Sequence, residues 1–340
     1  MADSRGTARG GLHALLGGKV LCMQGFGRRR ATIRAFVVAG FVSIPWGVSS
    51  AAGMTREKLL VGGIEREYLV SAAKSDRPRP TVLVLHGTLL NGDLMVPVMG
   101  FEPILVREGL VAVYPSAVAG EWNDGSAESV NWGAASNDDV GFLRALVAHL
   151  VRTGVSDRGR VYVTGYSNGG VMAFRLMCET DGVFAAAAAI AATLPSELAS
   201  SCRPVRPMPM LIMNGTADPL APFDGGDLPL SGGRALSTEA TISFLRKVNG
   251  CREAVKLDEL PDVDPNDGSR VTVSNWTTCS SGAPVVLYRI KGGGHRVPSL
   301  RPGVPFVEPL VGSLNHDFEA AEAIWSFFKD KIRSADRAQR

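Results

Sequence analysis

The chain has 340 residues, of which 45% are apolar and 20% are charged, and its formal net charge is +3. These fractions are ordinary for a folded globular protein and exclude a disordered or collagen-like chain. Residues 1–53 carry seven Lys or Arg and one acid, whereas the remainder carries 29 basic and 32 acidic residues. Without a basic patch beyond the leader, we expect no nucleic-acid partner. The length allows one large α/β domain or two small domains.

The first 52 residues have the order of a secretory signal. A basic run at 28–30 is followed by a mostly apolar stretch at 35–48 and by small residues at 50–52, which matches an n-region, an h-region and a cleavage site. The apolar stretch falls short of the roughly 20 residues that span a membrane, although an anchor or a buried helix stays an alternative. We predict a secreted or periplasmic protein whose mature chain begins near Gly53. Met23 as the start would give an n-region of ordinary length, and the arginines only weakly match a twin-arginine signal.

The cysteines favour disulfide bonds. Cys22 belongs to the leader, and four others remain: Cys178, Cys202, Cys251 and Cys279. An even number in an exported chain favours pairing, with four unpaired buried thiols as the weaker alternative. There is no C-x-x-C pair and no His/Cys cluster at zinc spacing, so we predict no metal site.

From about residue 57, strand-like and helix-like segments alternate. The apolar runs predict strands at 81–85, 110–114, 160–164, 183–192, 208–213 and 285–290. Helical spacing predicts helices at 139–152, 168–178, 236–248 and 318–332. The turn-rich segment 262–269 has some likeness to a calcium-binding loop, but its Gly falls one position late and the twelfth residue is not Glu. We interpret it as a hairpin turn. The alternation predicts a doubly wound, mostly parallel sheet in a single domain.

The segment 165–169 reads GYSNG and fits the pattern G-x-S-x-G. A predicted strand precedes the motif and a predicted helix follows it. This is the setting of a nucleophile elbow, in which a tight turn exposes a serine hydroxyl. Ser167 is therefore a candidate nucleophile, and the alternative is a glycine-rich turn whose serine caps a helix.

A serine nucleophile needs a base, and the base needs an orienting carboxylate. In the chain order Ser, acid, His of α/β-hydrolases, His295 is the candidate base because it follows the strand 285–290. Asp218 is the candidate acid because it follows the strand 208–213. His316 is expected to open the last helix as a capping or surface residue. Asp224 lies further from its strand, and Asp317 follows the histidine, so both are weaker candidates.

An oxyanion hole needs two backbone N–H donors, one after the nucleophile and one from a loop after an early strand. Asn168 supplies the first by position, and Thr88 is the candidate for the second. His86 lies in the same early loop. Its place ahead of the serine favours a structural role over that of a base.

Several motifs together resemble the polyhydroxybutyrate depolymerase and feruloyl esterase group of secreted α/β-hydrolases. The resemblance runs from about residue 68 to 331 and includes HGT at 86–88, NDDVGFL at 137–143, GYSNGG at 165–170, NGTADPLAPFDGG at 214–226, NGC at 249–251, GGGH at 292–295 and IWSFF at 324–328. It implies the α/β-hydrolase fold over residues 53–340 and places the nucleophile, acid and base of the family on the three residues chosen above. It also implies two disulfides, Cys178–Cys202 and Cys251–Cys279.

One departure concerns the acyl pocket. The family often has a small residue, Trp and Pro after GGGH, whereas Arg296 and Val297 precede Pro298 here, so the preferred acyl group can differ. Trp122, Trp132 and Tyr166 are candidate substrate contacts, with packing an equally good interpretation of the tryptophans.

These features predict an exported serine hydrolase that cleaves small or oligomeric carboxylic esters without a cofactor or a metal. Peptidase or thioesterase activity with the same three residues, or a non-catalytic binding protein on the same fold, are the alternatives. The choice between hydroxyalkanoate, feruloyl and acetyl esters, and the oligomeric state, stay open. No segment after the last predicted helix suggests a surface-binding module, so we expect soluble esters to be cleaved faster than crystalline polyester.

Overall fold

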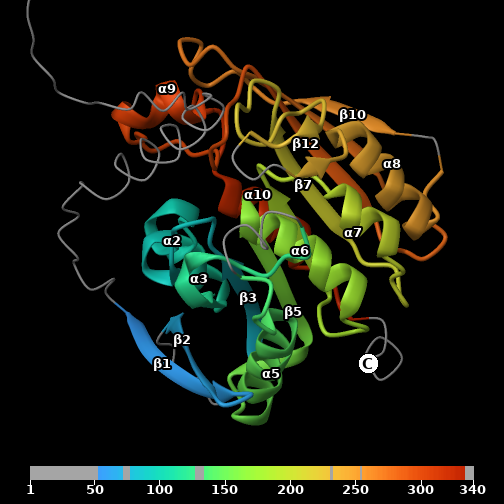
Figure 1. Cartoon of the computed structure of the whole chain (residues 1–340). Helices are drawn as coiled ribbons and strands as arrows, with labels where there is room; N and C mark the ends of the chain where they lie inside the picture. Colours follow the sequence, from blue (N-terminus) through green and yellow to red (C-terminus); the bar gives the residue numbers. More distant parts are fainter. Residues whose placement is uncertain (1–52, 72–76, 127–133, 230–232, 253–254, 334–340) are drawn as a thin grey trace, which may run out of the picture. The chain divides into compact units, whose positions relative to one another are not determined.

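A ten-stranded sheet forms the centre of the computed structural model (Figure 1). The structure describes residues 53–333 except 72–76, 127–133, 230–232 and 253–254. The predicted leader with Cys22, its cleavage site, and Trp132 therefore lie outside the described residues. The strands of the sheet are β1 (Met54–Val61), β2 (Ile64–Ser71), β3 (Arg79–Leu85), β4 (Val111–Pro115), β5 (Ser156–Tyr166), β6 (Ala186–Ile190), β7 (Met210–Gly215), β10 (Lys256–Glu259), β11 (Arg270–Trp276) and β12 (Val285–Lys291).

The strand order is β1-β2-β4-β3-β5-β6-β7-β12-β11-β10. The six strands from β4 to β12 in this order pair in parallel. The hairpin of β1 and β2 extends one edge and the hairpin of β10 and β11 extends the other, both antiparallel to their neighbours. The predicted mostly parallel sheet is therefore confirmed, and 262–269 connects two antiparallel strands, as interpreted from its turn residues. A separate antiparallel pair joins β8 (Gly226–Asp227) to β9 (Arg234–Ala235).

Helices cover both faces of the sheet. They are α2 (Gly92–Met99), α3 (Glu102–Glu108), α5 (Asp139–Arg152), α6 (Asn168–Glu179), α7 (Ser196–Ser201), α8 (Thr238–Asn249), α9 (Glu308–Val311) and α10 (Ala320–Phe328), with short 3₁₀ turns η1 (Val118–Gly120) and η2 (Pro305–Val307). Buried side chains of α5, α6 and α8 share one core with alternate strand residues such as Leu83 and Val163. Those of α2, α3 and α10 share a second core with the intervening residues, such as Val82 and Tyr162.

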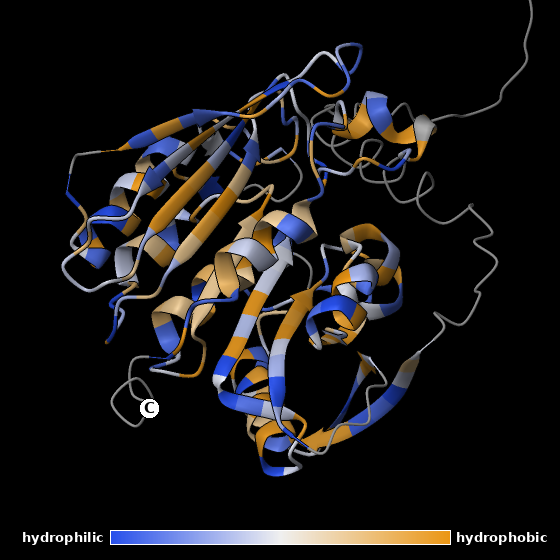
Figure 2. Ribbon diagram, turned by 180° about the vertical axis from the view of Figure 1, so that it is seen from behind, coloured by the Kyte–Doolittle hydropathy of each residue, from blue (hydrophilic) through white to orange (hydrophobic). Residues whose placement is uncertain are grey.

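The central strands are apolar along their length because both faces are covered. All five residues of β4 and of β6 are buried, and the strands carry hydrophobic colours along much of their length in Figure 2. Burying a large apolar side chain contributes roughly 1.5–3 kcal/mol, so the two cores stabilise the sheet whose strand ends carry the site described below. The described residues fall into a single domain.

Local signals explain some of the helix and strand ends. Asp138 caps α5 by accepting a hydrogen bond from the Gly141 N–H at 2.8 Å, and the predicted helix 139–152 has the observed bounds. The predicted strand 183–192 is shortened to β6, and Ala191 just after it has a φ of 50°, which a continuing strand does not allow. The last helix begins at Ala320 rather than 318, so His316 does not open it, in contrast to the prediction.

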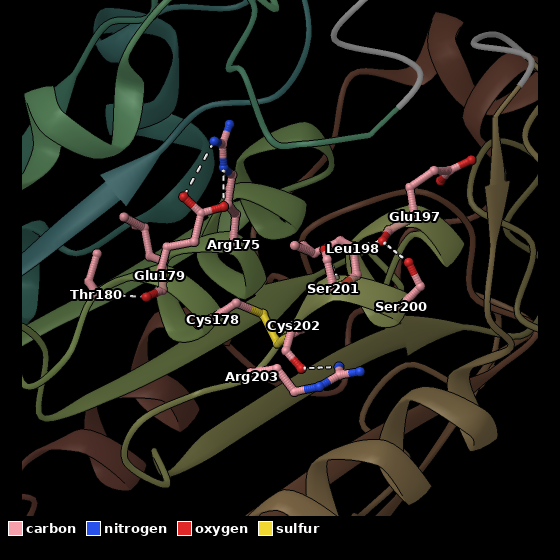
Figure 3. Close-up of a disulfide and its surroundings, with 11 residues drawn as sticks. Arg175, Cys178, Glu179, Thr180, Glu197, Leu198, Ser200, Ser201, Cys202 and Arg203 are labelled. Atoms are coloured by element: carbon pink, nitrogen blue, oxygen red, sulfur yellow. Dashed lines mark hydrogen bonds and ion pairs between the residues drawn. A yellow bond between two sulfur atoms is a disulfide. The ribbon is translucent and has the colours of Figure 1, made fainter.

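Two disulfides join segments that flank the central strands. Cys178 in the last turn of α6 bonds Cys202 at the end of α7, and Cys251 bonds Cys279. These are the pairings that the resemblance implies. Figure 3 shows the first bond beside the ion pair that Arg175 and Glu179 form along α6. The bond ties the helix that follows Ser167 to the segment that leads into β7.

Candidate active site

Ser167 lies in a sharp turn between β5 and α6. Its backbone angles, φ 55° and ψ −122°, fall where side chains other than glycine rarely occur. The turn is so tight that a Cβ on Gly165 would lie 2.0 Å from the Gly169 carbonyl oxygen, and a Cβ on Gly169 would lie 2.5 Å from that of His86. Glycine at both positions is therefore a steric requirement of the turn. This geometry matches the strand, turn and helix expected around G-x-S-x-G.

The structure brings the side chains of Ser167, His295 and Asp218 together. His295 Nε2 lies 2.9 Å from Ser167 Oγ, and His295 Nδ1 lies 2.8 Å from Asp218 Oδ2. The other carboxylate oxygen of Asp218 accepts hydrogen bonds from the backbone N–H groups of Leu220 and Ala221 at 2.8 and 2.7 Å. The imidazole and the carboxylate are buried, so one continuous hydrogen-bonded chain runs from the backbone to the serine hydroxyl.

The loops after β7 and β12 hold Asp218 and His295 at a fixed separation. The Ala217 N–H donates to the Gly293 carbonyl at 2.9 Å, one residue from Asp218 and two from His295. Tyr166 donates from its hydroxyl to the His295 carbonyl at 2.8 Å, and the two ring centres are 5.2 Å apart. Burial raises the pKa of Tyr166 well above its usual value, so the phenol stays a neutral donor. The backbone bond and the Tyr166 hydroxyl thus fix the loop that carries the imidazole.

The loop after β3 lies directly beside Ser167. A Cβ on Gly87 would be 3.3 Å from the Ser167 Cβ, so the Thr88 backbone begins next to the serine. His86 is fully buried, with Nδ1 2.8 Å from the Gly87 carbonyl and Nε2 accepting from the Ala117 N–H at 2.9 Å. Burial lowers the pKa of His86 to about 4, so its ring is neutral at pH 7. The geometry agrees with a structural role for this histidine.

A second set of contacts surrounds Asn168, which the sequence offered only for its backbone N–H. Its side-chain oxygen accepts from the Trp122 N–H at 2.8 Å, while its nitrogen donates to the Trp122 carbonyl at 3.2 Å and to Asp124 Oδ2 at 2.7 Å. Asp124 is 1% exposed, and burial raises the pKa of its carboxyl to about 6. Sequence reasoning missed Asp124, because an Asn-Asp-Gly-Ser run is typical of any turn.

Of the three candidate substrate contacts, the structure describes two, which differ in their burial. Trp122 is fully buried and donates from its indole nitrogen to the His86 carbonyl at 3.0 Å, and its ring lies 5.0 Å from the His86 ring at a tilt of 37°. These contacts favour packing, the alternative that the sequence left open for this residue. Tyr166 is partly exposed beside His295, and its contact with substrate stays a prediction. Trp132 lies outside the described residues.

The residues that competed for catalytic roles lie elsewhere. Asp224 is exposed. The carboxylate of Asp317 is buried and accepts from the Val263 N–H at 2.7 Å. His316 is partly exposed, and its Nδ1 lies 2.8 Å from the Ser299 carbonyl.

The described residues meet the requirements of neither a metal site nor a membrane-spanning helix. No group of three or more His, Cys, Asp or Glu in the described part of the chain is arranged to hold a metal ion. Within those same residues, no helix is both long and apolar enough to cross a membrane.

Comparison with characterised proteins places the chain among esterases. No family model matches it. It is 30% identical over 306 residues to "Putative esterase NocK" of Nocardia uniformis subsp. tsuyamanensis, covering 86% of this chain and 88% of that protein. It is 23% identical to a probable feruloyl esterase C of Aspergillus flavus over 87% of this chain and 97% of that one. A match to feruloyl esterase B of Piromyces equi, at 27% identity, spans 60% of this chain and 37% of that longer protein.

Solved structures support the same fold. A thermostable esterase superposes with a TM-score of 0.50 at 14% identity, covering 83% of this chain and 64% of its own. The acetyl xylan esterase of Aspergillus awamori gives a TM-score of 0.50 at 15% identity, covering 72% and 95%. The feruloyl esterase part of the expected resemblance is confirmed, whereas its polyhydroxybutyrate depolymerase part stays a prediction. The chain belongs to the family of α/β-hydrolase carboxylic ester hydrolases that includes NocK.

Proposed function

We propose that this esterase uses Ser167 as nucleophile, His295 as general base and Asp218 as the carboxylate that orients the base. The observation that carries the proposal is the continuous path of two hydrogen bonds, 2.9 and 2.8 Å long, from the serine hydroxyl through the imidazole to the buried carboxylate. A serine hydroxyl is a weak nucleophile at its ordinary pKa and becomes effective when an adjacent base removes its proton. The path supplies that base in the correct position.

The orientation of the imidazole decides which nitrogen takes the proton. Asp218 accepts the Nδ1–H of His295, which leaves the Nε2 lone pair directed at Ser167 Oγ. As Oγ attacks the ester carbonyl carbon, its proton moves to Nε2, and the resulting imidazolium is stabilised by the neighbouring carboxylate. The imidazolium then gives the proton to the leaving alcohol, and a serine acyl ester remains.

The negative charge that develops on the carbonyl oxygen needs donors that are already in place. The backbone N–H of Asn168 is one candidate: it lies in the first turn of α6, where N–H groups have no partner within the helix. Thr88, beside Ser167 on the other loop, is the second candidate. A water molecule activated by His295 then attacks the acyl ester, and the same two donors stabilise the oxyanion that forms. Collapse of this intermediate releases the acid, so no step requires a cofactor.

We further propose export and an aryl or short-chain acyl ester as substrate. The two disulfides support export, because such bonds persist outside reducing compartments. The names of relatives as feruloyl esterases support the substrate class. Arg296, next to His295 and half-buried, stands where the resembled family often has a small residue, and the buried Val297 stands where it often has Trp. The replacement of the Trp by Val297 is expected to change the acyl preference relative to those relatives.

The proposal is tested with an ester panel at fixed enzyme concentration. The panel contains p-nitrophenyl acetate, methyl ferulate, acetylated xylan oligomers and a hydroxybutyrate dimer, with Ser167→Ala as the paired variant. Turnover of at least one ester by the parent, and its loss in folded Ser167→Ala, is the expected result. Equal turnover by parent and variant would show that another group is the nucleophile. A peptide p-nitroanilide and an acyl thioester are assayed beside the panel, and faster cleavage of either than of every ester would shift the substrate class.

A further inference from the structure

The loop 117–126 connects the two sides of the proposed oxyanion hole. On one side, the Leu89 N–H donates to the Gly120 carbonyl at 2.8 Å, and the Trp122 indole donates to the His86 carbonyl at 3.0 Å. On the other side, the backbone of Trp122 forms two hydrogen bonds with the Asn168 side chain. A displacement of this loop would therefore move the two candidate oxyanion donors relative to each other.

Asp124 fixes this loop to α6 through a buried carboxylate. Oδ2 accepts from the Asn168 side-chain nitrogen at 2.7 Å, and Oδ1 accepts from the Ser126 N–H at 2.9 Å and the Ser126 hydroxyl at 2.5 Å. All three partners donate, and only an ionised carboxylate accepts on both oxygens without presenting a proton of its own. Isolation of such a charge from water is costly, and the three donors offset part of that cost.

The surroundings of Asp124 leave its charge only partly balanced. Arg175 of α6 attracts the Asp124 carboxylate without a direct contact. The Arg175 guanidinium instead donates to the Asn123 carbonyl at 2.6 Å and pairs with Glu179. Asp139 at the start of α5 holds the same loop by accepting from the Asn123 N–H at 2.7 Å. Across Trp122 lies His86, whose ring is neutral above about pH 4.

We infer that Asp124 is a positioning residue for ester hydrolysis, which acts in its ionised form by holding Asn168 and the loop 117–126 so that both oxyanion donors face the developing charge. The inference rests on the proposed roles of Ser167 and of the Asn168 N–H. Protonation removes the charge of the carboxylate and so weakens it as an acceptor for the Asn168 side chain. Because burial raises the pKa of Asp124 to about 6, activity falls as the pH drops through this value.

Asp124→Asn is the primary test because it keeps the shape and removes one acceptor. The amide introduced by this substitution must direct its NH₂ toward either the Asn168 side chain or the Ser126 N–H, and both are donors. We expect kcat for p-nitrophenyl acetate at pH 8 to fall roughly 10- to 100-fold, less than removal of an oxyanion donor, with KM within about threefold. The inhibition constant of a trifluoromethyl ketone, which forms an oxyanion on the serine, should rise by the same factor as kcat/KM falls. Asp227→Asn, at an exposed surface pair, is the matched control.

Ser126→Ala provides a second test that does not touch Asn168. The Ser126 hydroxyl hydrogen bond lowers the pKa of Asp124, so its loss should move the acid limb of the kcat/KM profile to higher pH while kcat at pH 8.5 stays near the parental value. Unaltered kcat and inhibition constant in folded Asp124→Asn, or an unmoved acid limb in Ser126→Ala, would overturn the inference. Retained turnover in Ser167→Ala, measured in the same series, would instead overturn the proposed function.

Discussion

Asp218→Asn should remove most activity without disturbing the fold. Asp218 Oδ1 accepts from two backbone N–H groups at 2.8 and 2.7 Å, so an asparagine has to place its oxygen there and its NH₂ toward His295 Nδ1. The imidazole must then accept on Nδ1 and carry its proton on Nε2, where it faces Ser167 and cannot act as a base. The equivalent change in a serine protease costs about 10⁴ in kcat through the same wrong tautomer, which corresponds to ~5.5 kcal/mol.

The assay is kcat/KM for p-nitrophenyl acetate, with far-ultraviolet circular dichroism and thermal unfolding as checks on the fold. Asp224→Asn is the matched control, because it makes the same change of charge on an exposed residue in the same loop. Its activity should equal that of the parent. An Asp218→Asn variant within tenfold of the parent would refute the assignment of the orienting carboxylate.

Three further predictions concern stability. Replacement of both Cys178 and Cys202 by Ser should lower the free energy of unfolding by about 3 kcal/mol for a 24-residue separation, as measured by denaturant titration of the parent and the double variant. Gly165→Ala should give little folded protein, since its Cβ would lie 2.0 Å from a carbonyl oxygen of α6; normal yield and parental melting temperature would contradict this. Asp139→Asn should cost roughly 3–5 kcal/mol, because the buried Arg66 guanidinium, 2.6 Å from Asp139, loses its counter-charge. An unchanged unfolding midpoint would count against it.

Much of the fold was predictable because its signals are local. The apolar runs mark strands that are buried on both faces, and the capping residue Asp138 marks the start of α5. The arrangement around Ser167 was equally predictable, since Gly165 and Gly169 are required by the turn itself. The order of the strands and the edge hairpins depends on pairings between residues far apart in sequence, which periodicity does not encode.

The contacts around the candidate site show where sequence reasoning ends. In the sequence, Trp122 fits a substrate contact and a packing residue equally well, and only the structure shows its indole buried beside His86. Asp124 gave no distinguishing signal, because its importance arises from Asn168, 44 residues away along the chain. The predicted helix 318–332 is longer than α10 (Ala320–Phe328), because the apolar spacing continues through residues that the structure places outside the helix.

Covalent labelling tests the central claim most directly. The parent protein is treated with a fluorophosphonate, which reacts with an activated serine, and the peptides are analysed by mass spectrometry while residual esterase activity is followed. We predict one adduct, on Ser167, whose extent matches the loss of activity and which an excess of a good ester substrate slows. His295→Ala should react far more slowly, because the hydroxyl then lacks its base. Full labelling of Ser167 with activity retained, or inactivation with the adduct on another residue, would contradict the account.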